Sequence, residues 1–303
     1  MHSRRFYMVA ATVLLSCSFG VQAQSQPVAQ AAQSAPKAAV KYGSDPAAGR
    51  TFIHDGVKFY YEVYGAGKPL LLVHGNGGSI ANFKVQIDYF RKSYKVIAMD
   101  SRDQGKSGDS PGQLTYENMA DDLAALLDQL NTGPVNVLGW SDGGIESLLL
   151  AIRHPEKVKK LAAMGSNLNP SEEAVYPEVI AWAKSLTDSM PNKETPAGRR
   201  ELKVSRLLTT EPHIDPRALE AITAPALILA GDHDVIRDEH TVEIYHHIPN
   251  SQLCIFPNAT HMVPYDDPAL FNATVDRFFR RPFVKLDRVK DLTRSLDAMK
   301  ASE

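Results

Sequence analysis

Short apolar runs constrain the fold of this chain more than any other feature of its sequence. Six runs made almost entirely of apolar side chains lie at positions 70–73, 96–99, 135–138, 161–164, 226–230 and 253–256. A continuous apolar run of this length is typical of a strand covered on both faces, as in a parallel sheet. Helical patterns lie between the runs, such as the apolar stripe of residues 119–130. The alternation predicts an α/β fold with a doubly wound, mostly parallel sheet.

One interval lacks a strand-like run and contains only helical signals. Between positions 164 and 226, helices are expected to start at Pro177, Pro196 and Pro216, because proline is favoured at the first helical position. A connection of about 60 residues is far longer than the usual one between neighbouring elements. We therefore interpret residues 165–222 as a helical lid inserted into the sheet, with a long ordinary crossover as the alternative.

The N-terminal segment has the three parts of a secretory signal peptide. Arg4 and Arg5 precede an apolar run at 6–15, and Ala23 marks a plausible cleavage site. Cleavage there leaves 303 − 23 = 280 residues and a net charge of 31 − 35 = −4. The prediction is an exported protein, periplasmic or secreted. The alternative is a lipoprotein anchored to a membrane through Cys17.

The remaining chain divides by composition into three parts. Residues 24–49 are rich in Ala, Gln, Pro and Ser and are expected to be a disordered linker. Residues 50–280 carry the apolar runs and form the predicted domain, and residues 281–303 are a charged tail, expected to be a peripheral helix or a mobile end. If the signal peptide is removed, Cys254 is the only cysteine, so no internal disulfide can form.

The charge balance and the absence of several motifs limit the possible functions. Lys and Arg number 33 against 35 Asp and Glu, which argues against a nucleic-acid-binding protein. The sequence has no HExxH, no paired Cys/His spacing, no P-loop and no dinucleotide fingerprint. We therefore expect no metal and no other cofactor, and a small molecule as the partner. The oligomeric state stays open.

A candidate nucleophile lies between a predicted strand and a predicted helix. The run at 135–138 is followed by Gly139-Trp140-Ser141-Asp142-Gly143 and then by a helical run at 145–152. In a G-x-S-x-G turn, glycines let a strained strand-to-helix connection close, which leaves the serine hydroxyl exposed at the helix N-terminus. The context predicts Ser141 as a catalytic nucleophile.

A serine nucleophile needs a base and an acid that orients the base. His261 follows the last apolar run, and Asp234 follows the run at 226–230, so both are expected at the carboxyl edge of the sheet. Asp232 competes with Asp234 for the acid; we favour Asp234 because it lies further into the turn. A Gly-rich turn after the first run places Asn76 beside this edge, and the backbone N–H groups of Asn76 and Asp142 are the predicted oxyanion hole.

These motifs together resemble the α/β-hydrolase superfamily, of the alpha/beta hydrolase-1 type. The resemblance covers about residues 51–280 and rests on a hairpin around Asp55-Gly56, His74-Gly75, Asp100-Ser-Arg102-Asp-Gln-Gly105-Lys-Ser107, Gly139-Trp-Ser141-Asp-Gly143-Gly, Gly231-Asp-His-Asp234 and Asn258-Ala-Thr-His261. It implies Ser141, Asp234 and His261 as the catalytic triad. Asp103 stands where the family usually has Gly, which is expected to reshape a loop without touching the chemistry. The elbow is similar to that of biphenyl-hydrolase-like, valacyclovirase-type esterases.

The sequence predicts a serine hydrolase that cleaves a small-molecule carboxylic ester through an acyl-enzyme. Lactone, amide or carbon–carbon bond hydrolysis on the same triad stays open, as does a non-catalytic, exported ligand-binding protein. Trp140, Asp142, Tyr176 and Trp182 are candidate substrate contacts. The Asp142 carboxylate would pair with a substrate ammonium, or it would only suit the helix dipole. The lid residues could equally be core.

Overall fold

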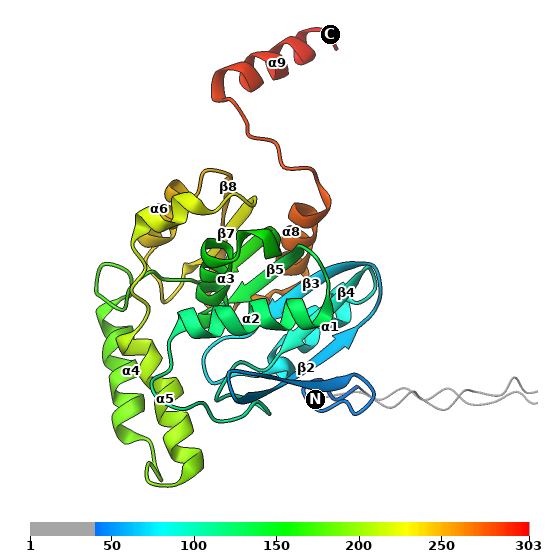
Figure 1. Ribbon diagram of the computed structural model, residues 1–303. Helices are drawn as coiled ribbons and strands as arrows, with labels where there is room; N and C mark the ends of the chain where they lie inside the picture. Colours follow the sequence, from blue (N-terminus) through cyan, green and yellow to red (C-terminus); the bar gives the residue numbers. More distant parts are fainter. Residues whose placement is uncertain (1–39, 303) are drawn as a thin grey trace, which may run out of the picture. The chain divides into compact units, whose positions relative to one another are not determined.

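The computed structural model describes residues 40–302. The predicted signal peptide and most of the predicted linker lie outside the described residues. The described chain forms one eight-stranded sheet with strand order β1-β2-β4-β3-β5-β6-β7-β8 (Figure 1). The strands are β1 (Gly49–His54), β2 (Val57–Tyr64), β3 (Lys68–Val73), β4 (Tyr94–Met99), β5 (Val135–Trp140), β6 (Val158–Met164), β7 (Ala226–His233) and β8 (Ser251–Thr260).

The pairing directions confirm the predicted α/β class. The hairpin β1–β2 and the pair β2–β4 are antiparallel, and every other neighbouring pair is parallel. All six apolar runs lie within strands β3 to β8. One expectation was wrong in part: β8 is an edge strand, so it is covered less than a central strand, and Leu253 keeps 36% of its surface exposed.

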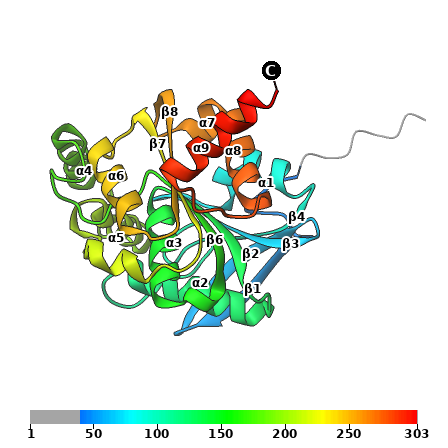
Figure 2. The same ribbon diagram turned by 90° about the horizontal axis from the view of Figure 1, so that it is seen from above.

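Helices cover both faces of the sheet, as continuous apolar strands require (Figure 2). Leu71 and Val73 belong to one core, which includes apolar residues of α2, α3 and α6. Leu70 and Leu72 point to the other face, into a core that includes residues of α1 and α8. The helices are α1 (Lys84–Phe90), α2 (Tyr116–Leu130), α3 (Asp142–Arg153), α6 (Asp238–His247), the short α7 (Val263–Asp266) and α8 (Pro268–Arg280).

The helical insertion, residues 165–222, lies between β6 and β7. It contains α4 (Pro177–Ser189), α5 (Pro196–Thr210) and a 3-10 helix (Pro216–Ala221), each starting at a predicted proline. None of its residues, all of which the structure describes, belongs to a named strand, and α4 lies beside α5 (Figure 1). Lys203 of α5 joins the insertion to the loop after β4, because its Nζ lies 2.5 Å from Asp103 Oδ1.

Asp103, at the position where the family usually has glycine, makes polar contacts of its own. Its φ of 62° lies in the left-handed region, which favours glycine. The buried carboxylate accepts hydrogen bonds from Ser110 and contacts Lys203. Polar contacts to the insertion therefore accompany the strained backbone.

The chain ends in an isolated amphipathic helix, α9 (Arg288–Lys300). An extended segment connects it to α8 (Figure 1). None of the side chains of α9 is buried. For the charged tail, a peripheral helix and a mobile end were the two expectations, and the structure contains a helix there. None of the described helices has the length and apolar composition that crossing a membrane requires.

Close approach of α3 to β3 generates a testable prediction. A Cβ on Gly143 would overlap the carbonyl oxygen of Val73. The backbone fixes the position of this Cβ, and the carbonyl is itself backbone, so no side-chain rotation can relieve the overlap in Gly143→Ala. We expect a loss of about 3 kcal/mol in the free energy of unfolding. Denaturant titration measures this loss. In the control Gly108→Ala, the new Cβ would meet its nearest atom at an ordinary 3.4 Å. Equal stability of the two variants would contradict this packing.

Candidate active site

The elbow after β5 holds Ser141 in a strained conformation. β5 ends at Trp140 and α3 begins at Asp142, and Ser141 between them has φ 59° and ψ −124°. Its backbone N–H donates to the carbonyl of Met164 on β6 at 2.8 Å. A Cβ on Gly139 would overlap the backbone of Gly143, so the turn closes only with glycine there. The predicted G-x-S-x-G turn therefore has a direct steric basis.

The structure places Asp234 beside His261. Asp234 Oδ1 lies 2.7 Å from His261 Nδ1, and the Asp234 side chain is fully buried. Two nearby backbone N–H groups, that of Gly231 in β7 and that of Ile236 after it, also donate to this carboxylate. A carboxylate fixed in this way orients the imidazole with a proton on Nδ1, which leaves Nε2 free to act as a base.

Asp232, the competing acid, has a different place in the structure. Its exposed carboxylate accepts hydrogen bonds from the backbone N–H groups of Asn258 and Ala259 at 2.8 and 2.9 Å. The His233 side chain and these two bonds lower the pKa of Asp232 to about 2. Asp232 therefore fastens the end of β8 to the end of β7, and Asp234 is the carboxylate that contacts His261.

Four neighbouring strands bring the site together at their carboxyl ends. Ser141 follows β5, Gly165 follows β6, Asp234 follows β7 and His261 follows β8. Gly165 has φ 62°, and a Cβ there would lie 2.6 Å from His261 Cε1, so glycine makes room for the imidazole. Within the described residues no hydrogen bond joins Ser141 to His261, although both line one cavity. Such bonds are often long without substrate and tighten in the complex.

Trp140 supports His261 through both its indole nitrogen and its ring. Its Nε1 donates to the His261 backbone carbonyl at 2.8 Å, and the two rings lie 5.6 Å apart. Trp140 also lines the cavity. Trp140, predicted as a substrate contact, therefore also positions His261, a role that the sequence did not indicate.

A buried histidine organises the loop that carries Asn76. His74 Nδ1 donates to the carbonyl of Gly75 at 2.8 Å, and its Nε2 accepts from the backbone N–H of Ser101 at 3.0 Å. Burial lowers the pKa of His74, so this imidazole is neutral. The loop brings Asn76 to the cavity beside Ser141 and Asp142, the first residue of α3. The Asp142 N–H is one of those that a helix leaves without an internal acceptor.

The Asp142 carboxylate is buried behind the nucleophile. Only 2% of Asp142 is exposed, and its Oδ2 accepts from Asn76 Nδ2 at 2.8 Å. Burial raises the pKa of Asp142 to about 6, against hydrogen bonds from Asn76 and Tyr116 that lower it. Burial and Asp142 raise the pKa of Tyr116 well above its usual value. Tyr116 is a residue of the site that sequence reasoning missed, because its helix pattern is that of ordinary core.

The cavity above Ser141 has a volume of about 380 Å³ and an apolar wall from the helical insertion. Trp182, a candidate substrate contact, and Leu186 line it from α4. Besides Trp140, its apolar lining consists of Val175, Val179, Ile180, Trp182, Ala183, Leu186, Leu208, Val235, Ile236 and Met262. The expectation for Tyr176 was wrong: it precedes α4 outside the cavity, and its ring lies under the Arg237 guanidinium at 4.8 Å.

The charged groups of the cavity are acidic. Its described lining includes the carboxyl groups of Asp142 and Glu211 and no Lys or Arg. Glu211 is 8% exposed, and burial raises the pKa of its carboxyl. Nothing in the sequence pattern pointed to Glu211, which directly follows α5. Across the described residues, no cluster of His, Cys, Asp and Glu could hold a metal ion.

Comparisons with known proteins find relatives of the same fold. A family model described as alpha/beta hydrolase fold matches residues 68–193. The mouse sn-1-specific diacylglycerol lipase ABHD11 is 29% identical over 248 residues, which cover 69% of this chain and 80% of that protein. The mouse serine hydrolase BPHL is 27% identical over 246 residues, covering 75% and 84%. An Acinetobacter baylyi (E)-2-((N-methylformamido)methylene)succinate hydrolase is 26% identical over 239 residues, covering 70% and 90%.

Solved structures share the fold. An α/β-hydrolase from a deep-sea metagenome library has a TM-score of 0.66 at 20% identity, covering 79% of this chain and all of the other. A thermophilic esterase from Thermogutta terrifontis has a TM-score of 0.64 at 25% identity, covering 77% and 97%. The chain is a hydrolase of the α/β-hydrolase fold, and its distant relatives include the BPHL and ABHD11 enzymes.

The burial of Asp142 predicts a pH-dependent contribution to stability. Because folding raises the pKa from 3.8 to about 6, the folded state holds this proton more tightly than the unfolded state between those values. The free energy of unfolding, relative to Asp142→Asn, should therefore fall as the pH rises through this window and then level off. Denaturant titrations of both proteins across the window measure the difference. A difference that rises with pH would contradict the burial of an ionisable carboxyl.

Proposed function

We propose that this protein is a serine hydrolase that cleaves a carboxylic ester of a small molecule through an acyl-enzyme on Ser141. One observation carries the proposal: the elbow serine and His261 line the same cavity, and the buried Asp234 carboxylate contacts His261 from behind. A protein that only binds a ligand gains nothing from this pair or from the strained turn at Ser141. The wider class, hydrolase, is that of its relatives.

The proposed reaction begins at His261. Its Nε2 takes the Ser141 hydroxyl proton while the oxygen attacks the ester carbonyl, and Asp234 stabilises the resulting imidazolium. The tetrahedral intermediate collapses when the C–O bond to the alcohol breaks and His261 returns the proton to the leaving oxygen. Water, deprotonated by the same imidazole, then attacks the acyl carbonyl, and His261 returns the proton to the Ser141 oxygen as the acyl–oxygen bond breaks and the acid leaves.

Backbone amides supply the proposed oxyanion hole. The N–H of Asn76 and the N–H of Asp142 are the donors, and the second also lies at the positive end of α3. Hydrogen bonds from Asn76 Nδ2 to Asp142 and to the carbonyl of Val204 fix the Asn76 loop against α3 and the helical insertion. This fixing supports donors that are in place before the reaction starts.

The charge of the cavity favours substrates without a carboxylate. Asp142 and Glu211 would repel an anionic substrate, and the described lining has no cation to bind one. The relative that acts on a succinate derivative is thus a poor guide to this substrate. The apolar wall suits an apolar acyl or alcohol group. Lactone, amide and carbon–carbon bond cleavage use the same triad. The negative charge of the cavity argues against such substrates only where they carry a carboxylate.

Loss of the nucleophile is the first test. Ser141→Ala should lower kcat for an ester such as p-nitrophenyl butyrate by about four to six orders of magnitude. It should also abolish labelling by a fluorophosphonate probe. Ser147→Ala is the matched control, because the Ser147 hydroxyl belongs to the same helix and donates to Gly143 O. A parent protein that the probe does not label would refute the proposal.

The two acids of the cavity give a prediction on specificity. Asp142→Asn and Glu211→Gln should each lower kcat/KM for an ester with an ammonium group, relative to a neutral ester of the same size, by about tenfold. Below pH about 6 the Asp142 part of this preference should fade, since its carboxyl gains a proton. Glu201→Gln removes an exposed charge from α5 and is the control. Equal losses for both esters would leave these acids without a role in selecting charge.

A further inference from the structure

The last helix carries an apolar face that nothing in the described chain covers. Val289, Leu292, Leu296 and Met299 follow at steps of three, four and three, so they form one stripe along α9. All four are between 47% and 74% exposed. Of thirteen exposed large hydrophobic side chains in the described residues, six lie within residues 284–299. Exposed large apolar side chains are therefore more frequent in the tail than in the rest of the described chain.

Basic residues accompany this stripe. Residues 281–300 contain six Lys and Arg against three Asp, a net charge of 6 − 3 = +3 in a chain of net charge −2. At 3.6 residues per turn, Arg288 and Lys300 lie along the two edges of the stripe. Long basic side chains in that position can bury their stems beside apolar groups and keep their charges in water.

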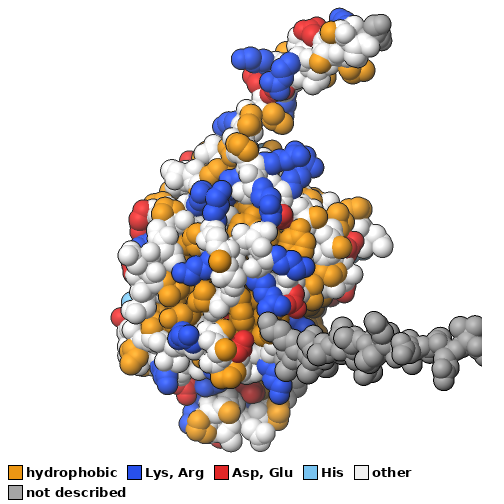
Figure 3. All heavy atoms as spheres, turned by 90° about the vertical axis from the view of Figure 1, so that its right-hand side faces the viewer, with side chains coloured by type: hydrophobic (Ala, Val, Ile, Leu, Met, Phe, Trp, Pro, Cys, Tyr) orange, Lys and Arg blue, Asp and Glu red, His pale blue; other side chains and the backbone are white. Residues whose placement is uncertain are grey.

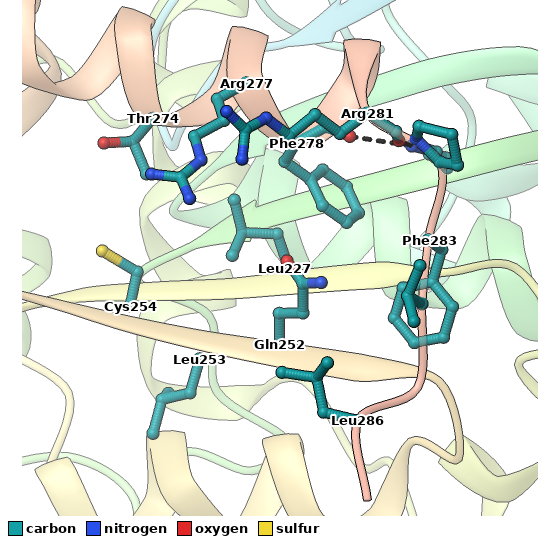
Figure 4. Close-up of a pocket in the computed structure, with 13 residues that line it drawn as sticks. Leu227, Gln252, Leu253, Cys254, Thr274, Arg277, Phe278, Arg281, Phe283 and Leu286 are labelled. Carbon is teal, nitrogen blue, oxygen red and sulfur yellow. Dashed lines mark hydrogen bonds between the residues drawn. The ribbon is translucent and has the colours of Figure 1, made fainter. Parts of the chain in front are cut away.

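A pocket of about 360 Å³ lies at the root of the tail (Figure 4). Arg277 and Arg281 reach it from the end of α8, and Phe283 and Leu286 from the extended segment. Leu253 of β8 is another of its lining residues, and 36% of its surface is exposed. Neither arginine has an ion-pair partner among the residues that the structure describes. The pocket thus combines free guanidinium groups with apolar surface.

The face of the molecule that carries the C-terminal helix is basic over a wider area. Figure 3 shows Lys and Arg side chains gathered on it, with hydrophobic patches between them and few acids. This combination of apolar and basic groups is the one that anionic lipid surfaces bind.

We propose that α9 and the pocket at its root dock on a membrane that contains anionic phospholipids. The helix lies in the plane of the interface with Val289, Leu292, Leu296 and Met299 inserted, and its basic edges contact phosphate groups. Arg277 and Arg281 bind lipid phosphates at the pocket. A helix with one narrow apolar face and a charged remainder is the type that lies on a membrane without crossing it.

A second copy of the chain fits the same helix less well. The stripe has heptad spacing, but it covers only about two heptads, whereas a stable coiled coil needs three or four. The positions beside the stripe hold Arg288, Thr293, Ser295 and Lys300, with no acid to pair with the two cations. Two such helices side by side would bring like charges together.

The docking surface lies at the opposite edge of the sheet from the candidate active site. The pocket is lined by Leu227 and Gln252, near the starts of β7 and β8, whereas Asp234 and His261 follow the ends of these strands. Docking would therefore hold the cavity and its helical insertion away from the lipid. The proposal does not depend on the proposed ester hydrolysis, and a soluble ester should be cleaved equally in the docked state.

Vesicle sedimentation with the full chain tests this proposal. The parent should sediment with vesicles of phosphatidylcholine and phosphatidylglycerol but not with phosphatidylcholine alone, and high salt should release it. Leu292→Ser/Leu296→Ser and Arg277→Gln/Arg281→Gln should each lower the partition by about tenfold. All variants keep the same N-terminal segment, so its own lipid affinity cancels between parent and variant, and the dependence on lipid charge is measured on that difference.

Two controls separate docking through the tail from a general effect of charge and from loss of the fold. Arg199→Gln/Arg206→Gln removes two charges from α5 and should leave the partition unchanged. Unfolding temperatures should stay equal, because the changed leucines are exposed. Equal partition of parent and leucine variant would overturn the proposal, as would binding that ignores lipid charge. If light scattering shows that the parent is a dimer and that only the leucine variant is a monomer, the proposal is also overturned, in favour of a second copy of the chain.

Discussion

Close contact of backbone with backbone at the elbow is the constraint on which the rest of this structure depends. Cβ atoms at Gly139 and Gly143 would overlap the backbones of Gly143 and Val73, so β5, α3 and β3 can meet only through glycines. This contact holds Ser141 at a positive φ at the N-terminus of α3, with its amide bonded to β6. The cores on both faces of the sheet keep these three elements together and so maintain the strain at the serine.

Much of the fold could be predicted because the strong local signals agree with one another. Each apolar run lies in a strand, and each proline-marked start in the insertion begins a helix. Ser141, Asp234 and His261 could be placed together because each follows a predicted strand, and parallel strands end at one edge of the sheet. Edge position was the exception: β8 reads like a central strand, yet one side of it has no strand neighbour.

Side-chain environments were harder to predict, because they depend on contacts between distant segments. The sequence could rank Asp234 above Asp232 but could not show that Asp232 bonds the β8 backbone. It marked Tyr176 as a cavity residue, whereas Arg237, distant in sequence, lies over its ring. It suggested a charge role for Asp142, but not its burial against Asn76 or the nearby Glu211. These are features of packing, which no local pattern contains.

In the proposed reaction, Ser141 carries the acyl group of the substrate during turnover. Rapid quenching with p-nitrophenyl acetate, followed by mass spectrometry, tests it directly. We expect a burst of nitrophenol equal to the enzyme present, and a protein whose mass has grown by one acetyl group on the peptide that contains Ser141. Steady turnover without a burst or an adduct, or an acetyl group on another residue during the burst, would contradict it.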